Sequence, residues 1–252
     1  MKPIFYILIC LFSTVSIAQN TIIFDQANAL YKDGNYNEAL NKYTSILEQE
    51  QHSAELYYNI ANAHYKLSNV APSIYYYEKA LLLKPNDKEI LNNIAFAKNM
   101  TIDAIEIVPE VGFSRLIKNA TNTMVFDNWA KLSVALVVLF VLLFLIYYFS
   151  QSTGKKRLAF VTSVSSLILA VVAFTFAFNS YGLELENQPA IVFAKESQIK
   201  SEPNLRSKEV FKLHEGTKVQ IMDTVPNWCK IKLSDGKTGW VDSDDIKRLK
   251  TF

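Results

Sequence analysis

Two long apolar runs, residues 129–149 and 158–178, constrain the fold of this chain of 252 residues more than any other feature. Each run is close to the ~20 residues that an α-helix needs to cross the ~30 Å hydrocarbon core of a bilayer. The short link between them, residues 150–157, carries Lys155, Lys156 and Arg157. The pattern therefore predicts two transmembrane helices that form a hairpin with a basic loop.

The polar residues of the two runs indicate what the hairpin does. Neither run contains Asp, Glu, His or Arg, and Lys131 lies close enough to its end to reach the interface. Transport and proton relay inside a membrane need ionisable side chains, so the hairpin is predicted to be an anchor. The second run offers small residues for close helix packing. They are Ser163, Ser165, Ser166 and Ala170.

The segment 1–18 has the features of a secretory signal peptide. Lys2 supplies the positive charge, residues 4–12 form a short apolar core, and Ala18 ends a small-x-small cleavage site. Cleavage after Ala18 is the favoured interpretation, and an uncleaved anchor is the alternative. Removal of the signal leaves one cysteine, Cys229, which predicts a buried apolar residue and not a disulfide or a metal ligand.

The signal peptide and the charges predict the topology. Residues 19–128 and 179–252 would lie outside the cytoplasm, and the basic loop would remain inside, as the positive-inside rule expects. The predicted location is the inner (cytoplasmic) membrane, with two spans and with both soluble parts on the periplasmic side.

A regular internal repeat organises the segment before the hairpin. Ala27, Ala61 and Ala95 are evenly spaced, and the stretches ALYKDGNYNEALNKY and LYYNIANAHYKLSNVAPSIYYYEKALLLKPND carry the repeat. The segment resembles tetratricopeptide repeats, which are helix–turn–helix units of about 34 residues. The resemblance implies an all-α domain at residues 19–100, with repeats at 20–53 and 54–87 and a capping helix at 88–100.

The first helix of each repeat is expected to line a concave ligand-binding strip. Aromatic and amide side chains provide rigid contact area and adaptable hydrogen bonds. The alternative for each tyrosine is packing against a neighbouring helix. Gly34 suits the turn between the helices of the first repeat, and Ser68 at the same place predicts a looser second turn. The strip consists of Phe24, Asn28, Tyr31, Tyr58, Asn59, Asn62 and Tyr65.

Residues 101–128 form a neck between the capping helix and the first span. Pro109 and Gly112 interrupt it, and apolar residues follow at helical spacing, with Arg115 and Lys118 on the other face. This pattern favours a short helix on the membrane surface, in contact with lipid. Packing against the repeat array is the equally weighted alternative.

Residues 188–250 change to the pattern of a small β-barrel. Short runs of β-forming residues alternate with turn residues, including the hairpin signal Asp235-Gly236. Together with Trp228-Cys229-Lys230-Ile231 and Gly239-Trp240-Val241, this order resembles bacterial SH3 (SH3b) domains. The resemblance implies an aromatic groove at Trp228 and Trp240 for an extended ligand. The alternative is that Trp240 belongs to the core. Leu205 and Val210 are expected to pack inside.

The sequence contains no recognisable catalytic, cofactor or metal site. The histidines His52, His64 and His214 are scattered, and the chain lacks nucleophile and phosphate-binding motifs. The 26 Lys and Arg nearly balance the 24 Asp and Glu, without the clustered basic face that nucleic-acid binding requires. The prediction is a non-catalytic protein that needs no cofactor and binds no nucleic acid.

The fold class predicted from these parts is a multidomain membrane protein, with an all-α repeat array, a two-helix transmembrane hairpin and a small all-β SH3-like barrel. This order resembles BatE-type proteins of Bacteroides aerotolerance (Bat) operons. The resemblance implies an adaptor that joins other membrane proteins, among them Bat proteins with von Willebrand A-type domains, with a role in oxygen tolerance or envelope stress. The alternative function is a cell-wall binder whose SH3-like domain recognises peptidoglycan.

Overall fold

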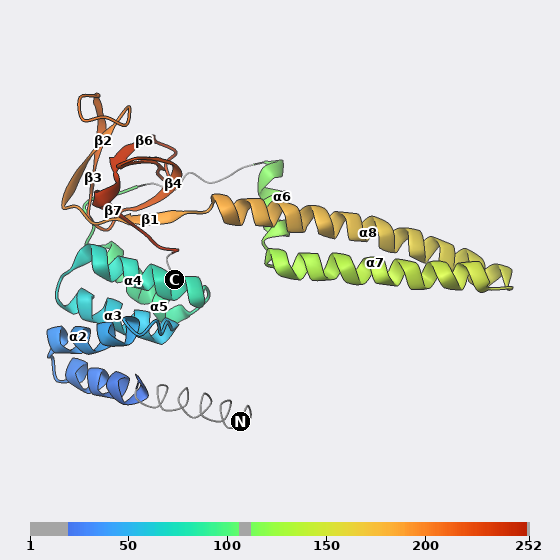
Figure 1. Ribbon diagram of the computed structural model, residues 1–252, viewed down its shortest axis with the longest axis horizontal. Coiled ribbons are helices and arrows are strands. Elements are labelled where there is room, and N and C mark those ends of the chain that lie inside the picture. Colours follow the sequence, from blue (N-terminus) through green and yellow to red (C-terminus); the bar gives the residue numbers. More distant parts are fainter. Residues whose placement is uncertain (1–19, 106–111, 251–252) are drawn as a thin grey trace, which may run out of the picture. The chain divides into compact units, whose positions relative to one another are not determined.

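The computed structural model describes residues 20–105 and 112–250, so the predicted signal peptide lies outside the described residues. The chain divides into two compact units (Figure 1). The first contains the helical array together with the C-terminal β domain, which are far apart in the sequence. The second, residues 108–187, contains the apolar helices.

The helical array begins with a helix at residues 20–32. The remaining helices of the array are α2 (Tyr36–Leu47), α3 (Ala54–Lys66), α4 (Val70–Leu83) and α5 (Lys88–Lys98). Ser53 caps α3, and Asp87, at the equivalent position of the next repeat, caps α5. Each side chain accepts a hydrogen bond from a backbone N–H of the first turn of its helix.

Small and aromatic residues at the repeat spacing form the core of the array. Ala27, Ala61 and Ala39 are fully buried, so adjacent helices approach closely. Tyr43 and Tyr77 fill the space between helices, with 1% of each side chain exposed. The repeat interpretation of residues 54–87 and the all-α class are therefore confirmed in the fold.

The two turns inside the repeats have the same geometry, and the expectation of a looser second turn is wrong. Gly34 has φ of +82° and Ser68 has φ of +59°. Each turn is closed by the same backbone bond, from Asn35 N to Leu30 O at 2.9 Å and from Asn69 N to His64 O at 3.0 Å. Ser68 thus holds a left-handed conformation that costs about 1–2 kcal/mol outside glycine, and packing of the helices on both sides maintains it.

The C-terminal domain is a seven-stranded antiparallel sheet in the order β3-β2-β6-β5-β4-β1-β7. Its core includes Ile199, Ile231, Val241 and the free cysteine Cys229, which is buried as predicted. The all-β class is confirmed. The strands are β1 (Pro189–Val192), β2 (Glu196–Lys200), β3 (Glu209–His214), β4 (Lys218–Val225), β5 (Trp228–Lys232), β6 (Thr238–Asp242) and β7 (Ile246–Arg248), with the short helix η1 (Ser243–Asp245) before β7.

Two residues of this domain do not lie where the sequence pattern places them. Leu205 is 79% exposed in the loop between β2 and β3, and Val210 is 52% exposed at the start of β3. The prediction that they pack inside is wrong. Phe211 and Leu213 of β3 pack in the core, whereas Val210 stands at a register shift and has no partner residue on β2, so it is left outside the core.

The second unit contains α6 (Phe113–Thr121), α7 (Phe126–Phe149) and α8 (Thr153–Glu186). α7 and α8 are long and apolar enough to cross a membrane, with mean hydropathies of 2.8 and 2.2. α8 has 34 residues, or about 51 Å at 1.5 Å per residue, so it is longer than a bilayer core. Helix therefore extends into the predicted loop at residues 150–157, and the basic residues lie in its first turns.

Serine hydroxyls join α7 and α8 inside the hairpin. Ser133 donates to the carbonyl of Ala170 at 3.0 Å, and Ser166 donates to the carbonyl of Leu136 at 2.8 Å. Ser163 is also buried, as the small-residue face predicts, but Ser165 is exposed. At about 100° per residue, Ser165 points away from the face that Ser166 and Ala170 share.

The neck divides between the two units. Residues 101–105 leave α5 and contact the β domain, whereas α6 contacts α8. The indole Nε1 of Trp129 donates to the carbonyl of Thr121 at 2.9 Å and connects the end of α6 to α7. Contact of this helix with lipid and its packing against the repeat array both stay predictions.

Candidate functional site

A hydrogen-bond network that recurs from one repeat to the next lies along the predicted strip of the array. The Asn28 Oδ1 accepts from Tyr43 Oη at 2.6 Å and from Asn59 Nδ2 at 2.9 Å. One repeat later, Asn62 Oδ1 accepts from the Tyr77 hydroxyl and from Asn93 Nδ2 at 3.1 Å. Each asparagine oxygen is thus engaged by two donors, which fixes the orientation of both amide groups.

The second network opens onto a groove of about 450 Å³. Tyr58 lines this groove, and its hydroxyl donates to Glu89 at 2.6 Å and accepts from Asn93 at 2.7 Å. Burial, followed by the hydrogen bond to Glu89, raises the pKa of Tyr58 to about 12. The hydroxyl therefore stays neutral and polar at every physiological pH. The groove is lined by Tyr31, Tyr58, Asn62, Tyr65, Lys66, Tyr77, Asn93 and Phe96.

The structure divides the seven predicted strip residues into three groups. Tyr31, Tyr58, Asn62 and Tyr65 share the groove, and Asn28 and Asn59 belong to the network beside it. Phe24 lines a different cavity. The sequence analysis missed three groove residues, Tyr77, Asn93 and Phe96. They lie one repeat after Tyr43, Asn59 and Asn62, so the repeat spacing could have identified them.

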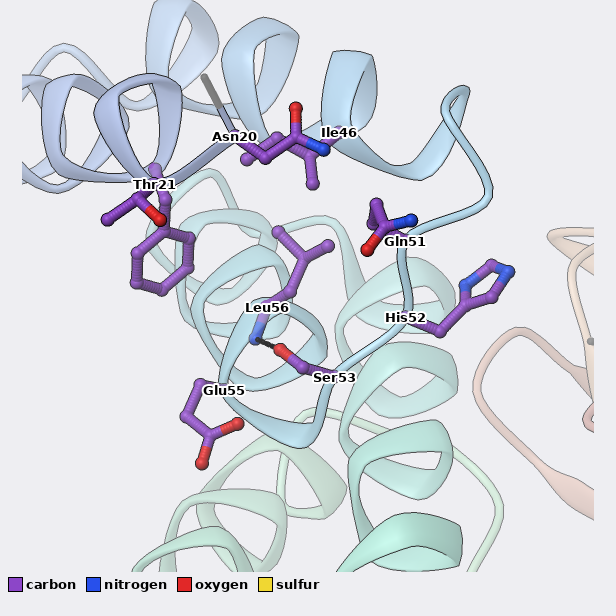
Figure 2. A pocket seen from close by; sticks show the side chains of 9 residues that line it. Asn20, Thr21, Ile46, Gln51, His52, Ser53, Glu55 and Leu56 are labelled. Atoms are coloured by element: carbon purple, nitrogen blue, oxygen red, sulfur yellow. Dashed lines mark hydrogen bonds between the residues drawn. The ribbon is translucent and has the colours of Figure 1, made fainter. Parts of the chain in front are cut away.

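Phe24 lies at a gap of about 350 Å³ between the first helix, the end of α2 and the start of α3 (Figure 2). Ile46 and Leu56 also line it, and Glu55 lies at its edge. In the next repeat the corresponding residues are Tyr58 and Glu89, whose hydrogen bond spans the space. Phe24 has no hydroxyl group and Glu55 pairs with Lys84 instead, so this gap remains open in the first repeat.

The β domain packs on α4 of the array through apolar contacts. Ile191 and Leu249 are fully buried and belong to the core cluster of the repeats. The rings of Tyr75 and Phe193 meet edge to face, 5.5 Å apart between centroids. Gly216 has φ of +87°, and a Cβ there would lie 2.9 Å from Ile74 Cδ1. Any other residue at this position would strain the backbone of the β3–β4 turn and force Ile74 to shift.

A buried carboxylate adds a polar connection at the same interface. The Glu78 side chain, on α4, is 7% exposed and lies between two ammonium groups, Lys98 Nζ at 3.0 Å and Lys218 Nζ at 2.7 Å. Burial by itself would raise the pKa of Glu78, but the charges of Lys218 and Lys98 outweigh it and hold this pKa below its ordinary value. One residue of the array thus pairs with one lysine from each domain.

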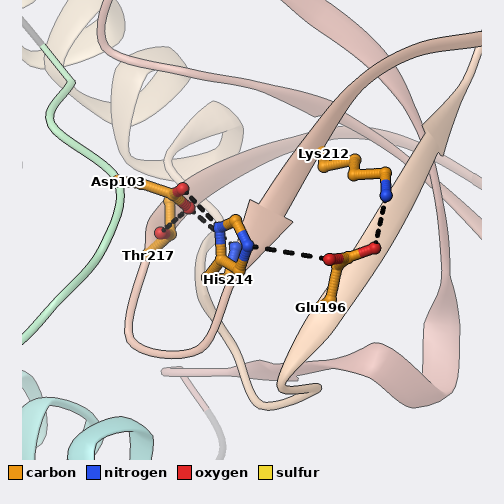
Figure 3. A network of polar contacts seen from close by, with 5 residues as sticks. All are labelled: Asp103, Glu196, Lys212, His214 and Thr217. Atoms are coloured by element: carbon orange, nitrogen blue, oxygen red, sulfur yellow. Dashed lines mark hydrogen bonds and ion pairs between the residues drawn. The ribbon is translucent and has the colours of Figure 1, made fainter.

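Asp103 provides a second polar connection, from the segment after α5 to the β3–β4 turn (Figure 3). Its carboxylate accepts from the backbone N–H of His214 at 2.7 Å and from Thr217 Oγ1 at 2.6 Å, and His214 Nδ1 lies 2.7 Å away. Burial would raise the pKa of Asp103, but the hydrogen bonds from Thr217 and His214 lower it below its ordinary value. Beyond His214, Glu196 pairs with Lys212 at 2.6 Å.

The two predicted tryptophans share the outer face of the sheet. Trp228 lies opposite Asp242, and Trp240 lies opposite Lys230, so the indoles are diagonal neighbours. Trp228 is 9% exposed and outside the core cluster, whereas Trp240 is half-buried. Trp240 is thus the more accessible of the two. The interface with the array uses β1, β7 and the turn after β3.

Within residues 20–105 and 112–250, no three His, Cys, Asp or Glu side chains are grouped so that they could hold a metal ion. Comparison with protein families gives two matches. Residues 54–87 match the tetratricopeptide repeat, and residues 197–247 match the bacterial SH3 domain. A search of curated protein sequences gives no match to the chain. Both matched families are typically non-catalytic interaction modules.

Proposed function

We propose that this protein is a non-catalytic, membrane-anchored adaptor. The groove of the repeat array binds an extended segment of one protein, and the outer face of the SH3-like domain binds a second ligand. The hairpin holds both at the membrane. Because both surfaces belong to one compact unit, two bound ligands are held close together. This raises the effective concentration of each ligand for the other.

The amide of Asn62 is the observation that carries the proposal. Its oxygen accepts from Tyr77 and Asn93, so its Nδ2 group is left as the donor. One hydrogen of this group faces the Tyr58 oxygen, and Asn62 lines the groove. A main-chain carbonyl of an extended peptide would accept the other hydrogen, with Tyr31 and Tyr65 as apolar walls.

The proposed setting is an envelope complex of the Bat type at the inner membrane, linked to oxygen tolerance, with both soluble domains on the periplasmic side. The order of repeats, two apolar helices and SH3-like domain supports it. The basic residues Lys155, Lys156 and Arg157, at one end of the hairpin, support this orientation. Von Willebrand A-type Bat proteins are the proposed partners.

Crosslinking and capture from native membranes test the adaptor proposal. The double variant Tyr58→Ala/Asn62→Ala is compared with the wild type, and Asn37→Ala, which removes an exposed amide from α2, is the control. We expect the double variant to lose one set of protein partners that the control retains. An identical set of partners for all three proteins contradicts a role of the groove.

A cell-wall function is the second candidate, and the half-buried Trp240 in a bacterial SH3 domain favours it. Sedimentation of the detergent-solubilised full chain with purified sacculi tests it. The whole chain is needed because Ile191 and Leu249 are buried against the repeats. Cosedimentation that Trp240→Ala abolishes would support cell-wall binding, and no cosedimentation of the wild type would exclude it.

A further inference from the structure

Each of three neighbouring helices contributes an aromatic ring to the groove of the repeat array. Tyr31 belongs to the first helix, Tyr65 occupies the equivalent position one repeat later on α3, and Phe96 lies on α5. The two tyrosines are half-buried and Phe96 is 61% exposed. A ligand that crosses these helices therefore meets rings that recur at about the spacing of the repeats.

The distance between these helices matches one turn of a polyproline II helix. Asn59 on α3 donates to Asn28 on the first helix at 2.9 Å, and Asn93 on α5 donates in the same way to Asn62 on α3 at 3.1 Å, so the helices are direct neighbours. Packed helices lie about 8–10 Å apart. A polyproline II chain has about three residues per turn of about 9.3 Å. Its residues i and i+3 point the same way and can therefore reach equivalent positions of adjacent helices.

The polar hydrogens of the groove suit main-chain carbonyl groups. Within the described part of the chain, the hydroxyls of Tyr31 and Tyr65 form no hydrogen bond, and both residues line the groove. Burial raises the pKa of Tyr31, so this hydroxyl keeps its proton. The second amide hydrogen of Asn62 is a third donor, since the first faces the Tyr58 oxygen. Proline retains its carbonyl but has no N–H, so a proline-rich segment accepts from these donors without bringing unpaired N–H groups into the groove.

The charged groups at the groove do not select a charged ligand. Among the described residues that line it, Lys66 alone is charged. Glu89 lies next to the lining, because it accepts the hydroxyl of Tyr58 at 2.6 Å. The lining thus has no cluster of like charges that would attract an acidic or a basic segment, and its aromatic rings and donors are left to determine what binds.

We infer that the repeat groove binds a neutral, proline-rich segment in the polyproline II conformation, with prolines three positions apart. One proline ring packs on Tyr31 and the next on Tyr65, and Asn62 donates to a carbonyl between them. Grooves lined by aromatic residues suit such segments, because the chain is already ordered before it binds. The inference rests on the proposed function, since it names the ligand class of the adaptor's groove.

Fluorescence anisotropy with the detergent-solubilised full chain tests the inference. The labelled probes contain Pro-Ala-Ala-Pro-Ala-Ala-Pro, the respaced Pro-Ala-Pro-Ala-Pro-Ala-Ala, or Val-Ala-Ala-Val-Ala-Ala-Val. We expect the first peptide to bind about tenfold more tightly than the valine peptide, because proline reduces the entropy lost on ordering. The respaced peptide should bind about threefold or more weakly than the first, because its prolines do not share one face. About 0.5 M salt should change the affinity by less than about twofold.

Two variants locate the binding site. Tyr31→Ala/Tyr65→Ala removes both rings and is expected to weaken binding of the first peptide about tenfold or more. Tyr31→Phe/Tyr65→Phe keeps the rings and their packing, so it tests the hydroxyls in an intact array, and it should weaken binding about three- to tenfold. Asn37→Ala, which removes an exposed amide from α2, is the control and is expected to retain wild-type affinity.

Three results would overturn the inference. Equal affinity for the proline and valine peptides, or no binding of any peptide, excludes recognition of a polyproline II segment. Equal affinity for the two proline peptides contradicts the match to the repeat spacing. A loss of binding in Trp240→Ala that neither tyrosine variant shares places the peptide on the SH3-like domain. Capture of partners from membranes decides the adaptor proposal separately, because groove-dependent partners without binding of proline peptides would refute only the ligand class.

Discussion

The two sides of the SH3-like domain use their charged residues differently. Toward the repeat array, Lys218 pairs with buried Glu78, and the β3–β4 turn is held by Asp103. On the outer face, Lys200 and Lys230 flank Trp240, and Glu209 and Asp223 lie opposite them on the next strands. The paired side is already occupied by this chain's own repeats. The difference indicates that the face around Trp240 is the one available to a ligand.

The largest expected effect on stability comes from a substitution of Gly216, at the interface between the β domain and the repeat array. A valine there would combine a left-handed backbone with contacts of 2.9 Å to Ile74 and Thr101. We expect Gly216→Val to lower the free energy of unfolding of the head, the unit formed by the array and the β domain, by about 2–5 kcal/mol, measured by urea unfolding of the full chain. Gly236→Ala is the control, since Gly236 has φ of +90° but open space around it. Equal losses would show that the interface does not constrain position 216.

Removal of the buried carboxylate should have the next largest effect. Glu78→Gln leaves Lys98 and Lys218 without their shared partner, and we expect a loss of about 1–3 kcal/mol in the same measurement. Because both lysines are about half exposed, water offsets part of the cost. Glu55→Gln breaks an exposed pair with Lys84 and should change stability by less than about 0.5 kcal/mol. Similar values for both variants would contradict the burial of Glu78 at an interface.

We expect acid to destabilise the interface between the β domain and the repeat array. The pKa values of Glu78 and Asp103 are lowered from 4.5 and 3.8 in the folded chain. A lowered pKa means that the unfolded chain binds protons first as the pH falls. The stabilisation is therefore complete above about pH 4.5 and is lost as the pH falls through the lowered pKa values. Hydrogen exchange of the β3–β4 turn between about pH 7 and 3 measures this. In Asp103→Asn the exchange should be faster at neutral pH and depend less on pH; an unchanged profile would contradict the role of Asp103.

Substitutions on the outer face of the SH3-like domain, around Trp240, should have the smallest effect on stability. We expect Lys200→Gln/Lys230→Gln to change the free energy of unfolding by less than about 0.5 kcal/mol, because charge pairs across a solvent-facing sheet surface contribute little to stability. Thermal unfolding of the full chain measures this. A loss as large as that of Glu78→Gln would place these lysines in the structural interface and remove the contrast between the two sides.

Local patterns in the sequence predicted most of the fold. The repeat spacing placed Asn62, and the same spacing could have identified Asn93, Tyr77 and Phe96, which the sequence analysis missed, because structural repeats place equivalent residues at equivalent points. Hydropathy located the apolar middle of α8 but not its ends, since a helix in water needs no apolar run. The prediction that Val210 packs inside was wrong, because the sequence does not reveal the register shift that leaves Val210 unpaired between β2 and β3.

The packing of the two soluble domains on each other could not be predicted from sequence alone. Ile191 and Leu249 are residue types that occur in the core of any β domain, and Glu78 looks in the sequence like an ordinary surface acid on a helix. Contacts between residues far apart in the sequence, such as Asp103 with His214, leave no periodic signal. Gly216 was visible only as a turn residue, although its lack of a Cβ is what admits Ile74.

Site-specific photo-crosslinking in native membranes tests the adaptor proposal most directly. A benzoylphenylalanine replaces Tyr65 in the repeat groove, Trp240 on the SH3-like face, or Glu38 on the exposed side of α2. We predict protein crosslinks from the first two positions that differ from one another and are absent from the third. The same products from all three positions, or no protein product from either candidate surface, would contradict the proposal that this protein joins two partners at the membrane.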